Sequence, residues 1–132
     1  MNPDPSGSGQ PTLVILVLPS VAGVTVALQG ELDMVTASWL RQELNQVFAE
    51  PGRKRLILDL SGLTFCDSSG LGAMIGAYNQ VQQTGGQIAL VGAQERLRNL
   101  LVRTGLDRIL PHYRTLAEAE SAFTPPPSTP DI

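Results

Sequence analysis

The residues whose side chains are best suited to binding or chemistry form the tetrapeptide Asp67-Ser68-Ser69-Gly70. Aspartate and serine are favoured where a helix begins, because their side-chain oxygens accept hydrogen bonds from unpaired backbone amides. The same amides, together with the helix dipole, stabilise an anion, so a phosphoserine would fit there too. From these four residues alone, helix capping is the simpler interpretation. Both roles can hold together, with the same amides holding a phosphorylated cap residue.

Two carboxylates lie earlier in the chain, in the motif GELD at residues 30–33. Glu31 and Asp33 are of the type that binds a divalent ion or acts as acid and base, but no other residue supports this use. A turn in which Asp33 caps the following helix explains them better. If the strands before the two motifs are neighbours, Asp33 lies beside the serines.

The single cysteine and the single histidine indicate no further chemistry. Cys66 precedes Asp67, whose charge disfavours the thiolate, so we expect a small and partly buried side chain. His112 has no acidic neighbour in sequence, and the residues around Ser68 do not form a nucleophile elbow, which argues against hydrolysis. One cysteine and one histidine also exclude a structural zinc site.

Three glycines begin the segment that follows Ser69, in GLGAMIG at residues 70–76. A dinucleotide fingerprint needs regular glycine spacing and a tight turn between strand and helix. Here the spacing is irregular and residues 60–67 are expected to form a long loop. A better interpretation is a helix face of small residues that packs closely against the sheet or a partner helix, formed by Gly72, Ala73, Gly76 and Ala77.

Length and composition bound the remaining possibilities. The 132 residues suit one domain, and a net charge of -3 lacks the basic excess that nucleic acid binding needs. The apolar run at 13–28 is interrupted by Pro19, Ser20 and Gly23, and no Lys or Arg precedes Arg41. We therefore expect neither a membrane span nor a secretory signal. The protein is expected to be cytoplasmic.

The segments that must position these residues alternate between strand and helix patterns. Residues 1–11 and 124–132 are rich in Pro, Gly or Ser and are expected to be disordered tails, which leaves a domain at 12–123. The hydrophobic patterns predict strands at 13–18, 24–28, 56–60, 87–91 and 109–110, and helices at 35–50, 69–83, 94–103 and 116–123. The fold class is then α/β, with a mixed sheet of four to five strands and about four helices. Asp67-Ser68-Ser69-Gly70 follows the carboxyl end of the third strand, where such sheets place function.

Several motifs in fixed order resemble one family. They are GELD at 30–33, LDLSGLTFCDSSGLG at 58–72, Gly-Gly before the fourth strand, and LLVRTGL at 100–106. Together they resemble the STAS domain of bacterial anti-sigma factor antagonists, over roughly residues 13–123. The resemblance implies the STAS fold, which agrees with the order of elements above.

The resemblance also implies a function without enzymatic activity or cofactor. In that family the serine after the aspartate of D-S-S-G is phosphorylated by an anti-sigma factor that is also a serine protein kinase, which corresponds to Ser68. The unphosphorylated antagonist binds the anti-sigma factor and releases the sigma factor, and a serine phosphatase restores the binding form. The switch and partner surface expected from it comprises Asp33, Asp67, Ser68, Ser69, Gly70 and Leu71. We expect a monomer whose fold does not change on phosphorylation.

Two other hypotheses remain open from the sequence. One is a STAS adaptor subunit of a lipid-transport or stress-signalling complex, which would copurify with a transporter ATPase and no kinase. The other is an enzyme that binds nucleotides or hydrolyses a substrate at the glycine-rich helix start. Turnover abolished by Ser68→Ala would identify the latter.

Overall fold

A computed structural model describes residues 12–19 and 23–123, and the two expected tails lie outside this range. Its centre is a five-stranded sheet in the order β1-β2-β3-β4-β5. The strands are β1 (Leu13–Pro19), β2 (Gly23–Leu32), β3 (Arg55–Cys66), β4 (Gln87–Val91) and β5 (His112–Tyr113). β1 and β2 pair antiparallel and all later pairs are parallel, so the mixed α/β sheet is confirmed.

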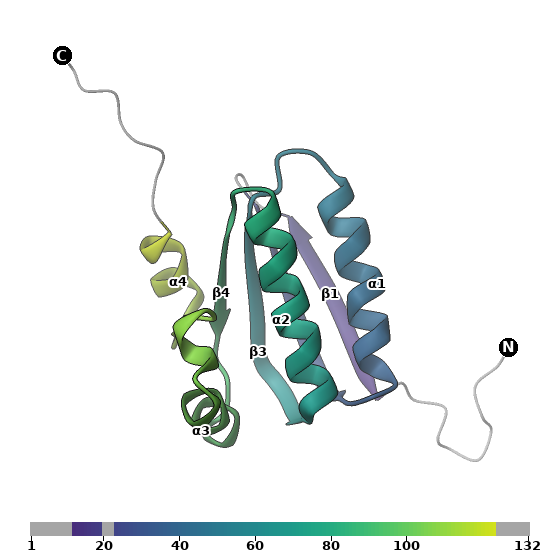
Figure 1. The fold of residues 1–132 in the computed structure, drawn as a ribbon, viewed down its shortest axis with the longest axis vertical. Helices are drawn as coiled ribbons and strands as arrows, with labels where there is room; N and C mark the ends of the chain where they lie inside the picture. Colours follow the sequence, from purple (N-terminus) through teal and green to yellow (C-terminus); the bar gives the residue numbers. More distant parts are fainter. Residues whose placement is uncertain (1–11, 20–22, 124–132) are drawn as a thin grey trace, which may run out of the picture.

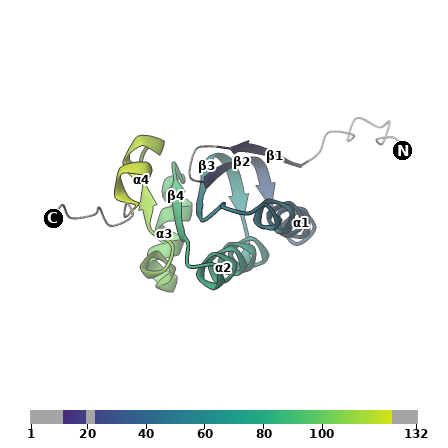
Figure 2. The same cartoon turned by 90° about the horizontal axis from the view of Figure 1, so that it is seen from above.

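Helices cover the sheet on both faces. They are α1 (Thr36–Ala49), α2 (Ser68–Gln83), α3 (Glu95–Thr104) and α4 (Leu116–Ala122), with a short 3-10 helix at Leu106–Arg108. α1 and α2 lie side by side in front of the sheet (Figure 1). α4 lies on the opposite side from α1 and α2 (Figure 2). No helix in the described part of the chain is long and apolar enough to span a membrane.

The main core lies between the sheet and α1, α2 and α3. Its largest fully buried side chains include Leu28, Leu32, Leu40, Leu58 and Met74, all with 0 % exposure. A smaller cluster on the other face joins β3 and β4 to α4. Burial on both faces explains why the LILDL segment of β3 reads as an almost continuous apolar run.

Two strands are longer than the sequence indicates. β2 continues through Gly30 and Glu31 to Leu32, and β3 continues to Cys66, where a loop at 60–67 was expected. Beyond Asp59, β3 pairs only with β2, with register shifts on either side of Gln29 and Gly30. Because this half of β3 has one neighbouring strand and an irregular register, it tolerates polar residues and a glycine. These residues obscure the strand pattern in the sequence.

The last strand also differs from its predicted position. Residues 109–110, expected as an edge strand, lie just beyond the 3-10 helix, and the edge strand is His112–Tyr113. Leu110 is fully buried and its amide bonds to the carbonyl of Leu106, which explains an apolar signal without strand geometry.

The glycines of α2 differ in how closely they are packed. A Cβ on Gly70 would lie 2.7 Å from the Cys66 sulfur and 2.9 Å from Leu32, whereas a Cβ on Gly76 would meet nothing within 4 Å. Of the small-residue face expected at Gly72, Ala73, Gly76 and Ala77, the two alanines are buried, whereas Gly76 faces open space. The buried members of the stretch are Gly70, Ala73 and Ala77.

Alanine at these two positions of the same helix should have opposite effects. Gly70→Ala should destabilise the fold by about 1–3 kcal/mol, because the new methyl group overpacks against Cys66 and Leu32. Gly76→Ala should stabilise it by about 0.5–1 kcal/mol, because alanine favours the helix and meets open space. Urea unfolding of both variants measures this, and equal effects would contradict the packing described.

The imidazole of His112 should make stability depend on pH. Its Nε2 atom accepts a 2.9 Å hydrogen bond from the Ala93 amide, and burial, with a smaller effect of Arg98, lowers the pKa of His112 below its usual 6.5. Because the folded-state pKa is the lower one, its contribution is present above about pH 6.5 and is lost as pH falls. Between about pH 8 and pH 5, the wild type should lose more unfolding free energy than His112→Gln. Parallel losses in the two proteins would refute this role.

Candidate functional site

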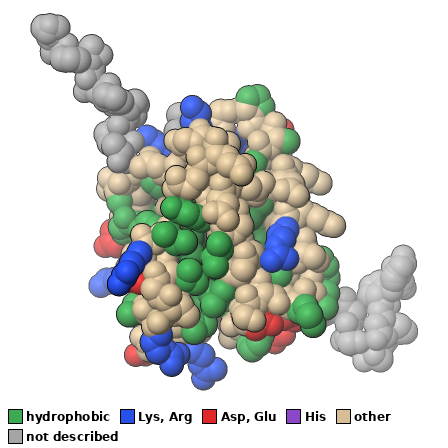
Figure 3. Space-filling view, viewed as in Figure 1, with side chains coloured by type: hydrophobic (Ala, Val, Ile, Leu, Met, Phe, Trp, Pro, Cys, Tyr) green, Lys and Arg blue, Asp and Glu red, His purple; other side chains and the backbone are tan. Residues whose placement is uncertain are grey.

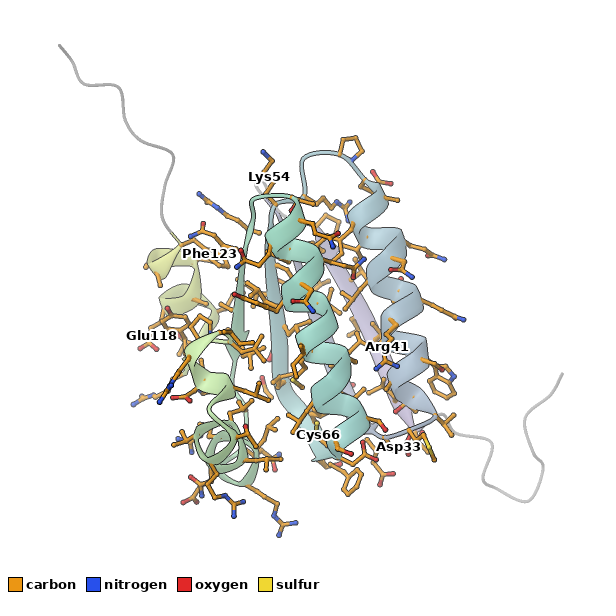
Figure 4. The ribbon with its side chains drawn as sticks, viewed as in Figure 1. Asp33, Arg41, Lys54, Cys66, Glu118 and Phe123 are labelled. Atoms are coloured by element: carbon orange, nitrogen blue, oxygen red, sulfur yellow. The ribbon has the colours of Figure 1, made fainter. Side chains whose placement is uncertain are left out.

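Parallel pairing of β2 and β3 brings the GELD motif at 30–33 and the Asp67-Ser68-Ser69-Gly70 motif to one end of the sheet. We call this region, where α1 and α2 begin, the corner. Leu32 at the end of β2 is paired with Cys66 at the end of β3, and the amide of Asp67 donates a 3.2 Å hydrogen bond to the Leu32 carbonyl. Asp33 directly follows Leu32 and Asp67 directly follows Cys66, and both aspartates line the same open hollow. Figure 4 shows Asp33 and Cys66 at the same end of the molecule. The expectation that the GELD motif lies beside the serines is confirmed.

Asp67 is the residue that caps α2. One of its carboxylate oxygens, Oδ1, accepts hydrogen bonds from the amides of Ser69 at 2.9 Å and Gly70 at 3.1 Å. Its carbonyl accepts the amide of Leu71 at 3.0 Å, which begins the helical pattern. Ser68 is the first helical residue, and its side chain is exposed. Two of the amides expected to hold a phosphoserine are therefore already occupied by Asp67.

Asp33 has a matching role at the start of α1. Its Oδ1 accepts the amides of Val35 at 3.0 Å and Thr36 at 2.9 Å, as predicted for a cap, while its own amide donates to the Thr36 hydroxyl at 2.8 Å. This reciprocal pair is a capping box. The hydrogen bond from the Thr36 backbone is the largest cause that lowers the pKa of Asp33 from its usual 3.8. Asp33 is thus an ionised side chain in a fixed position.

Cys66 anchors the corner from below. Its thiol lies against the Gly70 backbone, and burial raises the pKa of Cys66 to about 12, with a smaller contribution from the charge of Asp67. A thiol with so high a pKa stays protonated at neutral pH and is a poor nucleophile. This agrees with the expectation of a small, partly buried cysteine. The expectation rested on the charge of Asp67, but burial raises the pKa of Cys66 more than that charge does.

Exposed apolar side chains surround the two aspartates. Met34 is 74 % exposed, Val35 59 % and Phe65 48 %, and all three line the hollow with Asp33 and Asp67. In Figure 3, acidic and hydrophobic side chains lie next to one another at the end where α1 and α2 begin. Exposed apolar side chains that lie together beside polar groups are typical of a surface that binds a protein.

The other residues expected at the site differ in accessibility. Ser69 is half-buried, whereas Gly70 and Leu71 are buried, with Leu71 9 % exposed in the core. At this corner, Ser68 is therefore accessible, as is the apolar rim formed by Met34, Val35 and Phe65. Gly70 and Leu71 lie beneath Ser68 as part of its support.

No histidine lies within reach of Ser68 in the described part of the chain. His112 pairs with Leu90, which pairs with Leu58, and Cys66 is eight residues further along β3. At about 3.3 Å per residue this places His112 roughly 20 Å or more from Ser68. The described residues contain no group of three or more potential metal-binding side chains. Ser68 directly follows Asp67, and Asp67 lines the same hollow as Asp33.

Some residues of this corner were not predicted as part of it. Thr36 is fully buried and closes the capping box, and the D-x-x-T spacing from Asp33 is the signal that would have identified it. Met34 and Val35 could have been noticed as apolar residues at a turn. Phe65 falls in the segment expected to be a loop, and only its position near the end of β3 in the structure shows that it is exposed.

Comparison with known proteins agrees with this architecture. The model of the STAS domain family matches residues 13–119. The anti-sigma F factor antagonist of Paenibacillus polymyxa is 35% identical over 88 residues, which cover 67% of this chain and 75% of that protein. The anti-sigma-B factor antagonist of Bacillus subtilis is 36% identical over 87 residues, covering 66% and 78%.

A solved structure shows the same fold. The crystal structure of an anti-sigma factor antagonist from Mycobacterium paratuberculosis superposes with a TM-score of 0.75 at 30% identity, covering 92% of this chain and 97% of that one. The fold and the family match therefore agree over most of the described chain. The chain belongs to the STAS-domain family of anti-sigma factor antagonists.

Proposed function

We propose that this protein is a non-enzymatic cytoplasmic regulator that binds an anti-sigma factor and releases a sigma factor. Phosphorylation of Ser68 by that anti-sigma factor, acting as a serine kinase, abolishes binding, and a serine phosphatase restores it. The observation that carries this proposal is the exposed Ser68, which directly follows Asp67 beside a hollow with an apolar rim of Met34, Val35 and Phe65. The antagonists to which the chain is similar are named for the same kind of partner.

The modification itself is a phosphoryl transfer from ATP. The bond between the Ser68 oxygen and the γ-phosphorus forms as the bond to the β-phosphate oxygen breaks, ADP leaves, and the hydroxyl proton passes to a base of the kinase. The exposure of Ser68 gives a kinase access to the hydroxyl, which a buried serine would not allow. The protein supplies the acceptor, and the kinase supplies the catalytic groups.

The effect of the phosphate follows from where it is placed. It adds a charge of about -1.5 to -2 at neutral pH. Asp67 precedes Ser68, and Asp33 is held ionised in the same hollow. A partner that covers the apolar rim would have to bury this concentrated negative charge, which is costly without compensating cations. Binding should fail without any change of fold. The protein acts as a monomer in this scheme, with the corner reserved for its partner.

The site of phosphorylation is the first test. The protein is incubated with ATP and the candidate anti-sigma kinases of its own organism, and phosphate is located by mass spectrometry. We expect one phosphoryl group on Ser68, none on Ser68→Ala, and normal modification of the control Ser121→Ala, which removes an exposed serine hydroxyl on α4. Binding of the kinase should fall at least tenfold on phosphorylation and persist in Ser68→Ala. If no candidate modifies Ser68 and Ser68→Ala binds its natural partners unchanged, the adaptor hypothesis replaces this one.

The apolar rim should contribute most of the affinity. Phe65→Ala removes the aromatic side chain of this rim and should weaken binding of the anti-sigma factor by about tenfold or more. Leu18→Ala is the control, because Leu18 is equally exposed, at 52 %, but pairs with Thr25 at the opposite end of β2. Calorimetric titration measures both, and equal affinities would place the interface elsewhere.

A further inference from the structure

The guanidinium group of Arg41 lies in the seam between α1 and α2. Its Nη2 atom is 3.5 Å from the position of a Cβ on Gly72. One turn further along α1, Asn45 accepts a 3.0 Å hydrogen bond from Gln80 of α2, so this face of α1 is turned toward α2. Figure 4 shows Arg41 between the two helices. The side chain is exposed and makes no hydrogen bond or ion pair with any other described residue.

Ser68 lies one turn before Gly72 on the same face of α2. Gly72 is four residues after Ser68, and residues four apart in a helix have Cβ atoms about 5–6 Å from one another. Side chains tilt toward the amino end of a helix, so the Cβ position of Gly72, which Arg41 approaches, itself leans toward Ser68. Gly72 itself has no side chain to separate them. The Arg41 guanidinium is therefore within reach of a phosphate on Ser68.

The cap of α2 creates the need for such a partner. Asp67 already accepts the amides of Ser69 and Gly70, so these donors are not open to a phosphate on Ser68. Asp67 and Asp33 are both acidic and would repel it. A guanidinium presents paired donors that match phosphate geometry, which makes it the favoured side chain for this role.

We infer that Arg41 forms an intramolecular ion pair with phosphoserine 68 and holds the phosphate over the start of α2. This deepens the proposed function, on which it rests only in taking Ser68 as the modified residue. Pairing balances part of the added charge within the protein, so the folded domain tolerates the modification. It also occupies one donor edge of the Arg41 guanidinium, which a partner could otherwise contact.

The second pKa of the phosphoserine reports this pair directly. The full chain is prepared with phosphoserine incorporated at position 68 during translation, and the phosphate is titrated by phosphorus NMR at low ionic strength. Arg41→Gln should raise this pKa by about half a unit or more relative to the otherwise unchanged protein, because loss of a neighbouring cation disfavours the dianion. Arg41→Lys should raise it less, because the charge remains. Asp33 and Asp67 are present in every variant and cancel in the comparison.

Lys54→Gln is the matched control. It removes one exposed positive charge at the opposite end of the sheet, as Figure 4 shows, and should leave the phosphate pKa unchanged. An unchanged pKa in Arg41→Gln, or equal rises in Arg41→Gln and Lys54→Gln, would overturn the inference. Because the phosphate is introduced without a kinase, this result is independent of partner binding. The ion pair can fail while the phosphorylation switch stands, and the reverse.

Discussion

The parallel pairing of β2 with β3 is the constraint on which the functional corner depends. The paired ends Leu32 and Cys66, joined by the hydrogen bond from the Asp67 amide to the Leu32 carbonyl, fix where the next two helices begin. Each helix then starts with an aspartate that accepts backbone amides. Close packing of Gly70 against Cys66 and Leu32 leaves α2 little freedom to shift relative to the strands. Ser68 is exposed at a point that the backbone itself holds in place.

A rigid corner of this kind suits regulation by charge. Both flanking carboxylates are engaged by backbone donors, so neither is expected to move away when a third anion is added beside them. The surrounding apolar side chains gain favourable energy only when a partner covers them, and covering them requires burial of whatever charge Ser68 carries. In the proposed function, the charge at one oxygen atom would therefore control the energy of a much larger contact. The uncharged thiol of Cys66 and the neutral His112 lie outside this control.

Much of this arrangement was predictable because local signals and the tertiary structure agree. The alternation of strands and amphipathic helices gave the mixed sheet, and Asp33 could be recognised as a cap from its position before α1. The distal half of β3 could not be recognised, because it pairs on one side only and carries polar residues and a glycine among its apolar ones. The exposure of Phe65 and the burial of Leu71 depend on how β3 and α2 pack, which periodicity alone does not determine. The position of Arg41 over Gly72 depends on the packing of two helices whose relative shift no motif encodes.

The central claim is that phosphorylation of Ser68 is a local electrostatic change on a fixed backbone. Crystal structures of the unmodified chain and of the chain phosphorylated at Ser68 test this most directly. The account predicts that the backbones of residues 23–123 superpose within about 1 Å, the variation usual between rigid forms of one protein. A displacement of several ångströms in α1, α2 or the strand ends beneath them would contradict it and indicate a conformational switch.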